Sequence, residues 1–288
     1  MRTALAIGVC LVVLAAAAAD LGSQSSPAHA FFAFDNGVGR GQWQPAQQAR
    51  VLKDLGYDGI SYNETIDITN RLEAFRAAGL KIFALYIQGF LDKPVRYEPG
   101  LTNAIRLLKG TDTMIWLTIR EMRGEHDAEA ATLVREVADL AGESGIRVTL
   151  YPHSGFYVAT GEDALRIANR AGRTNVGVTV NLCHELMAGN GDRLESIVKA
   201  CAPRLFLVSI NGADRGTTVE QTVKFLDEGG FNVPGFVDML DRAGYTGPIG
   251  LQCYNLKGSP EENLKRAMKV WRRWGEAKGP GSDKPQQK

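Results

Sequence analysis

Two histidines occupy the positions best suited to acid–base chemistry in this sequence. The chain contains four histidines, and two of them, His153 and His184, come directly after two consecutive apolar runs of strand length. Imidazole changes its charge near neutral pH, so either ring can accept or donate a proton during a reaction. We therefore predict that His153 and His184 are catalytic. The alternative is that each is a buried structural residue that bonds a backbone group.

Uncharged polar side chains and aromatic rings follow most of the other apolar runs. A pocket walled by neutral hydrogen-bonding groups and aromatic rings suits a sugar or another polyol. The side chains that we expect to bind such a substrate are Tyr151, Asn181, Ser209, Asn211, Gln252, Tyr254, Glu64 and Tyr86. The alternative for any one of them is that it is polar only because loops face water. A small-molecule carbohydrate is the partner that this pattern predicts.

A regular alternation of strands and helices must position these side chains. Short apolar runs indicate strands at residues 31–34, 58–61, 81–87, 113–119, 146–151, 176–181, 204–210 and 249–254. Patterns of helical period indicate helices at residues 44–55, 69–78, 101–108, 127–143, 161–171, 192–201, 219–226, 234–243 and 260–274. Near-continuous apolar runs are typical of parallel strands that are buried on both faces. The order of elements therefore predicts a parallel sheet covered by helices.

The number and spacing of these units favour one architecture. The strand–helix units fill residues 31–275 at about 30 residues each, as in a (β/α)8 barrel. No Gly-, Ser- or Pro-rich linker divides this region, so we predict a single α/β domain, a (β/α)8 TIM barrel. A doubly wound open sheet is the alternative. In such barrels the site lies at the C-terminal ends of the strands, where the candidate residues fall.

The two ends of the chain are not expected to belong to the barrel. A basic residue precedes an apolar run at 4–19, and Ala-His-Ala at 28–30 has the small-x-small pattern of a cleavage site. Residues 1–30 are therefore predicted to be a signal peptide, with cleavage after Ala19 as the alternative. The mature protein is then expected to be secreted or periplasmic, without a membrane anchor. The polar residues 276–288 are predicted to form a disordered tail.

The composition excludes several classes of protein. Of 288 residues, 44% are hydrophobic and 23% are charged, which is typical of a globular protein and not of a disordered chain. The 33 basic and 32 acidic residues leave a net charge of +1, so no overall field attracts nucleic acid. Three of the four cysteines lie beyond residue 30, which is too few for a disulfide framework, although one bridge is compatible with the sequence. The oligomeric state is left open.

Several segments at the ends of the predicted strands carry a resemblance to a known family. They are Leu-Tyr-Pro-His at 150–153, Asn-Leu-Cys-His at 181–184, Val-Ser-Ile-Asn at 208–211 and Gly-Pro-Ile-Gly-Leu-Gln at 247–252. Together with Gly-Tyr-Asp-Gly-Ile at 56–60, they are similar to xylose isomerase-like TIM barrels, a superfamily of sugar isomerases, sugar-phosphate epimerases and apurinic endonucleases. The resemblance implies the barrel fold. It leaves the activity open, because one fold hosts many chemistries.

The resemblance also implies a divalent ion, held by Glu on strand 5, Asp or His on strand 6, His on strand 7 and Glu on strand 8. The aligned positions in this chain are Tyr151, Asn181, Ser209 and Gln252, and Ser61 stands where a Glu often closes strand 2. A hard divalent ion needs anionic oxygen ligands. We therefore expect no cofactor and no metal at the usual position.

Two other ways to hold a metal stay open. The first is a different site that uses His153, His184 and Cys183. The second takes carboxylates from loops that fold inward, and the side chains in question are Glu64, Glu121, Glu185 and Asp214.

These features predict an exported protein similar to sugar isomerases and epimerases. It acts on a carbohydrate or sugar derivative by proton transfer, without the usual divalent metal. A degenerate enzyme that binds carbohydrate without catalysis is the alternative. The nucleic-acid branch of the family is not expected, because export, the net charge and the missing ligands all oppose it.

Overall fold

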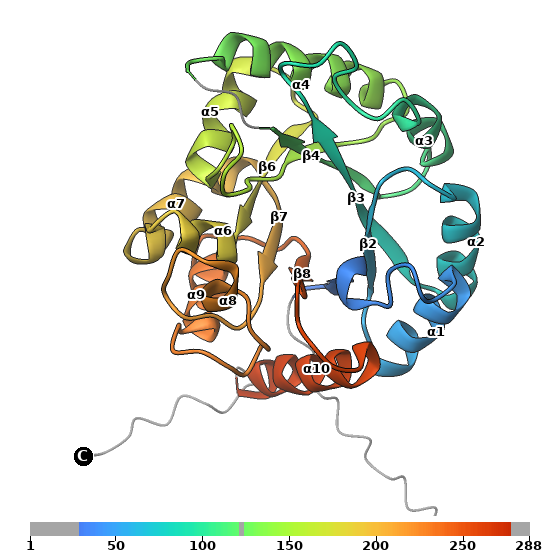
Figure 1. Cartoon of the computed structure of the whole chain (residues 1–288), viewed down its shortest axis with the longest axis vertical. Coiled ribbons are helices and arrows are strands. Elements are labelled where there is room, and N and C mark those ends of the chain that lie inside the picture. The colour runs from blue at the N-terminus through green and yellow to red at the C-terminus, as the bar shows by residue number, and fades with distance from the viewer. Residues whose placement is uncertain (1–28, 121–123, 278–288) are drawn as a thin grey trace, which may run out of the picture.

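The computed structural model describes residues 29–120 and 124–277 of the chain (Figure 1). The predicted signal peptide lies outside these residues except for His29 and Ala30, and the predicted tail lies outside them except for its first two residues.

The first two described residues already contact the body of the fold. The ring of His29 stacks on Tyr245 with 5.5 Å between the centroids, and its Nε2 lies 2.8 Å from Asp241 Oδ1. The Ala30 carbonyl accepts a hydrogen bond of 2.9 Å from the Ile249 N–H. His29 and Ala30 are therefore packed against the barrel.

Eight parallel strands form a closed barrel in the order of the sequence. The strands are β1 Phe31–Phe34, β2 Gly59–Asn63, β3 Lys81–Gly89, β4 Met114–Ile119, β5 Val148–Leu150, β6 Val176–Asn181, β7 Leu205–Ile210 and β8 Ile249–Leu251. The first strand pairs with the last, with Phe32 opposite Gly250. This closure confirms the predicted single-domain (β/α)8 TIM barrel and rules out the doubly wound open sheet.

Helices surround the barrel and account for the apolar outer faces of its strands (Figure 1). They are α1 Pro45–Leu55, α2 Ile68–Ala78, α3 Leu101–Leu107, α4 Asp127–Gly142, α5 Gly161–Ala171, α6 Leu182–Met187, α7 Leu194–Cys201, α8 Val219–Thr222, α9 Val233–Arg242 and α10 Pro260–Ala277. Helix α5 shows how the sequence sets such an element. Thr160 and Asp163 form a capping box at its start, and Gly172 ends it with φ of 64°, a conformation that glycine adopts without strain.

Two helices differ from those predicted from the sequence. Helix α6 begins directly after β6, in a segment predicted to be a loop, and it carries Cys183 and His184. Helix α8 ends at Thr222 instead of continuing to residue 226. The reason is that the Lys224 N–H donates to the Gly212 carbonyl at 2.7 Å, which pairs this segment with the chain that follows β7.

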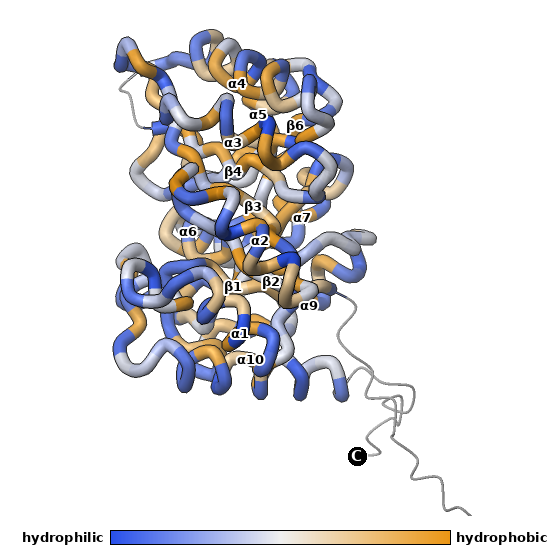
Figure 2. Tube along the Cα trace, turned by 90° about the vertical axis from the view of Figure 1, so that its right-hand side faces the viewer, coloured by the Kyte–Doolittle hydropathy of each residue, from blue (hydrophilic) through white to orange (hydrophobic). Residues whose placement is uncertain are grey.

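Aromatic side chains fill the interior of the barrel. Phe32 stacks on Phe83 at 4.7 Å, and Trp116 meets Tyr151 edge-on at 4.6 Å. The indole N–H of Trp116 donates to Thr179 Oγ1 at 2.7 Å, so its polar atom is also satisfied. A second apolar layer lies between the strands and the helices, and Figure 2 shows hydrophilic colours on the outer turns of the helices. These aromatic side chains close the interior of the barrel, so a site at the ends of the strands is bounded from below by them.

No helix in the described part of the chain is long and apolar enough to cross a membrane. The three described cysteines, Cys183, Cys201 and Cys253, are buried and free.

Candidate active site

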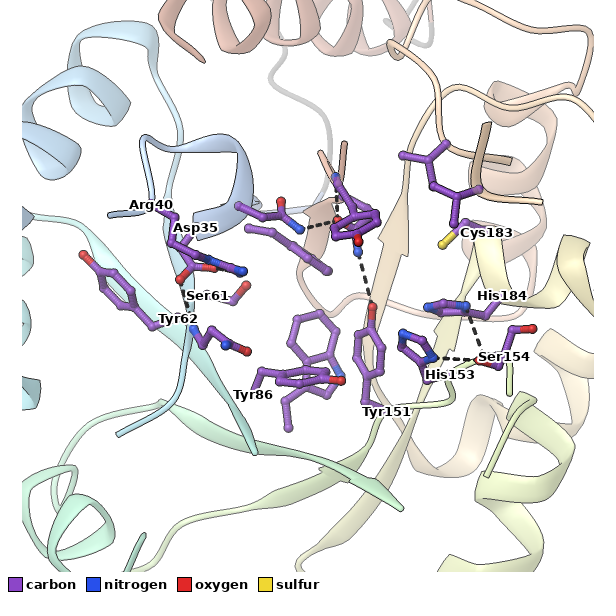
Figure 3. Close-up of a pocket in the computed structure, with 18 of the residues that line it drawn as sticks. Asp35, Arg40, Ser61, Tyr62, Tyr86, Tyr151, His153, Ser154, Cys183 and His184 are labelled. Carbon is purple, nitrogen blue, oxygen red and sulfur yellow. Dashed lines mark hydrogen bonds and ion pairs between the residues drawn. The ribbon is translucent and has the colours of Figure 1, made fainter. Parts of the chain in front are cut away.

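A cavity of about 360 Å³ lies at the ends of the strands where the chain leaves the barrel (Figure 3). The predicted site residues that line it are His153, His184, Tyr86, Tyr151, Gln252 and Tyr254. They come from β3, from α6 and from the segments that follow β5 and β8, and they converge because parallel strands end at one rim of the barrel. The cavity is therefore built largely from side chains that the sequence singled out.

The structure brings the two predicted catalytic histidines together. The ring centroids of His153 and His184 are 4.2 Å apart, although the residues are separated by a helix and a strand. His153 is also stacked on Phe156 at 4.0 Å. His184 reaches the cavity because α6 turns the chain immediately after β6, so that Cys183 and His184 both face it.

The backbone of Ser154 assigns a different proton arrangement to each ring. Its N–H can only donate, and it bonds Nδ1 of His184 at 3.2 Å, so the proton of the neutral His184 ring sits on Nε2. Its carbonyl can only accept, and it lies 2.8 Å from Nδ1 of His153, so Nδ1 carries the proton there. Nε2 of His153 is then an acceptor, and Nε2 of His184 is a donor.

Burial keeps both rings neutral. It lowers the pKa of His184 well below its ordinary value, and the neighbouring His153 lowers that pKa further. Burial also lowers the pKa of His153, while the Ser154 carbonyl opposes this effect and Arg120 adds to it. Near neutral pH the site therefore holds one imidazole that can accept a proton and one that can donate a hydrogen bond.

Tyr151 stands next to this pair in the centre of the cavity (Figure 3). Its ring meets His184 edge-on at 5.9 Å, and Gln252 Nε2 donates to its hydroxyl at 3.4 Å. Burial raises the pKa of Tyr151 well above its ordinary value, and the amides of Asn181 and Gln252 only partly oppose that rise. Tyr151 is thus a neutral phenol with its proton in place.

The other predicted substrate-binding residues do not line the cavity. Asn181 and Ser209 are fully buried neighbours on β6 and β7, and Asn181 Nδ2 and Ser209 Oγ have no hydrogen-bond partner within the described ranges. Asn211 is buried, and its Nδ2 donates to the carbonyls of Gly212 and Thr222 at 2.8 and 2.5 Å. The bonds of Asn211 hold the loop after β7, so the structure gives it a structural position.

The carboxylates near the strand ends are also occupied elsewhere. Glu64 is exposed and outside the cavity lining, at a residue with φ of 65°. Glu185 is buried beneath α5, where it accepts from the Gly161 N–H at 2.6 Å and from Asn190 at 2.7 Å. Burial raises the pKa of Glu185. Asp214 pairs with Lys224 at 3.1 Å, and Glu121 lies outside the described residues.

One charged pair lines the cavity on the side opposite the histidines (Figure 3). Asp35 follows β1, is almost fully buried, and forms an ion pair with Arg40. Its other oxygen accepts from the Asn63 N–H at 3.1 Å. Neither Asp35 nor Arg40 is among the site residues predicted from the sequence. The available signal was an acid directly after a buried strand with an arginine five residues later.

The donor set at the four positions aligned with a metal site is uncharged. Oε1 of Gln252 already accepts hydrogen bonds from Asn36 Nδ2 at 2.6 Å and from the Tyr254 N–H at 2.9 Å. Burial raises the pKa of the Cys183 thiol to about 12, so it is not a thiolate ligand. Across residues 29–120 and 124–277, no group of three or more His, Cys, Asp and Glu side chains could hold a metal ion.

Comparison with known proteins agrees with this architecture. A family model described as the xylose isomerase-like TIM barrel matches residues 100–274. A 3-dehydroshikimate dehydratase of Pseudomonas aeruginosa is 24% identical over 73% of this chain, but the match covers 36% of that protein, so the chain spans about a third of its length. An inosose isomerase of Bacillus velezensis is 23% identical over 78% of this chain and 89% of its own.

Among solved structures, a D-allulose 3-epimerase from Methylomonas sp. superposes with a TM-score of 0.69 at 16% identity. The superposition covers 87% of this chain and 99% of the epimerase. At that identity the likeness concerns the fold.

Proposed function

The chain belongs to the xylose isomerase-like TIM barrel family, and from this premise we propose that it isomerises or epimerises a carbohydrate or sugar derivative by proton transfer, without a divalent metal. The observation that carries the proposal is the pair of neutral histidines whose protons Ser154 assigns in opposite ways. The names of its relatives, an inosose isomerase and a D-allulose 3-epimerase, support a sugar or cyclic polyol as the substrate class.

The two rings divide the work of proton transfer. His153 Nε2 is the unprotonated nitrogen, so it is the base that removes a proton from a substrate carbon. His184 Nε2 carries a proton and donates it as a hydrogen bond to a substrate oxygen. A positioned general base is worth roughly 10²- to 10⁴-fold in rate.

The donors present do not fit a divalent ion. Such an ion needs oxygen ligands that carry negative charge, whereas the aligned positions offer a phenol, two amides and a hydroxyl. The oxygen of Gln252 is already used by two donors, and burial holds Tyr151 in its neutral form. No step of the proposed reaction therefore involves a metal.

Solvent isotope exchange tests this function directly. The purified protein is incubated with a panel of ketoses, aldoses and cyclic polyols in D2O, with and without a chelator, and deuterium entering carbon positions is followed by NMR. We expect exchange that survives the chelator. In His153→Gln we expect it to fall by about 10²-fold or more, whereas His126→Gln, a histidine outside the cavity lining, keeps the wild-type rate.

Two outcomes would contradict the proposal. Exchange that the chelator abolishes and added Mn²⁺ restores would show a metal-dependent reaction. Calorimetric binding of a sugar with no exchange at any carbon would identify a carbohydrate-binding protein that has lost catalysis, which the replacement of all four family ligands favours as the second candidate.

We also propose that the protein is exported, on the sequence of residues 1–30 alone. The mass of the protein from secreted, periplasmic and cytoplasmic fractions tests this. Loss of 19 or 30 residues from a secreted or periplasmic form is expected, and a chain found only in the cytoplasm with residues 1–30 intact would contradict it. Cleavage after Ala19 would keep the contacts of His29 with Tyr245 and Asp241.

A further inference from the structure

The polar groups around the Tyr151 hydroxyl are turned with their donors inward. A backbone N–H can only donate, and that of Tyr254 bonds Gln252 Oε1 at 2.9 Å. Asn36 Nδ2 donates to the same oxygen at 2.6 Å. The amide nitrogen of Gln252 must then face the other way, and it lies 3.4 Å from the Tyr151 hydroxyl oxygen. The oxygen end of this amide is therefore satisfied by the protein, and its N–H end faces the cavity side.

Asn181 repeats this arrangement from the neighbouring side. Its Oδ1 accepts from the Cys183 thiol at 3.2 Å. Its Nδ2 is fully buried and has no hydrogen-bond partner among the described residues, and the amide lies close enough to Tyr151 to oppose the rise in the phenol pKa. Because Asn181 lies outside the cavity lining, this donor acts on the phenol oxygen of Tyr151 and does not reach a ligand.

The proton of Tyr151 is left for a ligand. The phenol oxygen faces the amide nitrogens of Gln252 and Asn181, and the hydroxyl donates no hydrogen bond within the described part of the chain. The ring of His184 faces it, with the protonated Nε2 on the side away from Ser154 (Figure 3). Tyr151 O–H and His184 Nε2–H thus converge on one region of the cavity, and both are neutral donors.

We propose that Tyr151 and His184 form a binding site for an oxyanion, and that the substrate is a ketose or keto-polyol whose carbonyl oxygen occupies it. The proposal rests on the proposed function and names its substrate class. Neutral donors held in a buried site stabilise a negative charge that develops on oxygen during the reaction. The same site does not favour a cation, because the protons of Tyr151 and His184 face the cavity. The amide oxygens of Gln252 and Asn181, which could coordinate a cation, already accept hydrogen bonds from the protein.

The proton transfer then balances without a cofactor. The C–H bond next to the carbonyl breaks, and the proton goes to His153 Nε2. The electron pair of that bond forms the carbon–carbon double bond of an enolate, and the carbonyl π pair moves onto the oxygen held by Tyr151 and His184. Return of the proton by His153 to the same carbon regenerates the substrate. When the proton of the hydroxyl on that carbon first moves to the enolate oxygen, His153 returns its proton to the former carbonyl carbon, and the isomeric sugar forms. Protonated His153 and the enolate carry opposite charges throughout the intermediate.

A phenol that changes colour on ionisation tests this site without turnover. 4-Nitrophenol is titrated into the full-length mature protein at a pH below the ordinary pKa of the phenol, and absorbance reports whether the bound form is ionised. We expect wild type to bind the phenolate preferentially. Tyr151→Phe should weaken phenolate binding by about 10- to 100-fold, as expected for the loss of one hydrogen bond to a charged group.

Two further variants separate this site from general effects on the pocket. Gln252→Glu keeps the acceptor for Asn36 and for the Tyr254 N–H but places negative charge beside Tyr151, so phenolate binding should be lost. Tyr62→Phe is the matched control, because Tyr62 lines the cavity but its hydroxyl is used in a hydrogen bond to Gln48. Its phenolate affinity should equal that of wild type.

Three results would overturn the oxyanion site. They are binding of the neutral phenol only, equal phenolate affinity in wild type and Tyr151→Phe, and one tightly held Mn²⁺ per wild-type chain that Tyr151→Phe abolishes. The isotope experiment stays independent of these. Deuterium exchange without phenolate binding would contradict the oxyanion site and leave the proposed function intact. Phenolate binding without exchange would support the oxyanion site and contradict the proposed function.

Discussion

Two opposite walls of the cavity differ in whether their side chains carry charge (Figure 3). The ion-pair wall consists of Asp35 and Arg40, and the histidine wall consists of His153 and His184. On the first wall a buried carboxylate stays beside an arginine side chain that is 45% exposed. On the second wall burial lowers the pKa of both rings, so neither carries a charge.

This difference follows from access to water and from the partners of each group. Arg40 keeps much of its hydration, and a charge that is half exposed needs little compensation from the protein. The histidines face Tyr151, Phe156 and each other. None of these groups carries a negative charge that would stabilise a protonated imidazole. The ion-pair wall is therefore suited to orienting a polar ligand, and the histidine wall is suited to moving its protons.

The largest test of this division replaces one ring on the histidine wall. In His184→Phe an aromatic ring is kept, but the Nε2 donor is lost and the Ser154 N–H loses its acceptor. We expect deuterium exchange to slow by about 10²-fold or more, with little change in the apparent KM. The measurement is steady-state exchange by NMR. An unchanged rate would mean that His184 has only a structural position and that the walls do not differ in function.

The pH dependence of the exchange rate gives the next effect. Because burial holds the pKa of His153 below its ordinary value of about 6.5, more than half of the rings are still unprotonated at that pH. The rate should therefore reach half of its plateau only below pH 6.5, and it should fall about tenfold per pH unit at more acid pH. A profile measured from pH 4 to 9 checks this. A rate that declines from pH 7.5 downward would show a ring with a raised pKa, opposite in sign to the effect of burial.

On the ion-pair wall the expected change is in stability. Asp35→Asn keeps the shape of the side chain but removes the charge that faces Arg40 and weakens the acceptor for the Asn63 N–H. We expect the free energy of unfolding in urea to fall by about 1–2 kcal/mol. Arg40→Gln gives the comparison from the other partner. If neither substitution changes the unfolding midpoint, the ion pair does not stabilise the fold, and its place on the cavity wall would be its main role.

Much of the fold could be predicted because it depends on local pattern. Strands β1 and β6 have the bounds that their apolar runs predict, 31–34 and 176–181, and the helix at 161–171 also has its predicted bounds. Helix α6 was not predicted, because its six residues are too short to show a helical period and no residue caps it. That helix is nevertheless what turns His184 toward the cavity.

The site was less predictable, because its decisive features are tertiary. The sequence suggested His153 and His184 but could not show that one backbone, at Ser154, assigns both tautomers. Asn211 has the residue type of a sugar ligand, yet it bonds two carbonyls of its own loop. Arg40 was missed because it lies in a glycine-rich turn, where no periodic pattern marks a residue as facing the interior.

The smallest expected effect lies at the rim that joins the two walls. Tyr254 lines the cavity but is 55% exposed, and its backbone N–H, not its ring, holds Gln252 in place. Tyr254→Ala keeps that N–H and removes only an aromatic face on which a sugar can stack. We expect the apparent KM to rise by about 3- to 10-fold, which corresponds to roughly 0.7–1.4 kcal/mol, with kcat unchanged. Tyr254→Phe, which keeps the face and loses the hydroxyl, should behave as wild type. A fall in kcat for Tyr254→Ala would show that Tyr254 affects proton transfer through Gln252. The residues that act on the chemical step would then extend beyond the histidine wall.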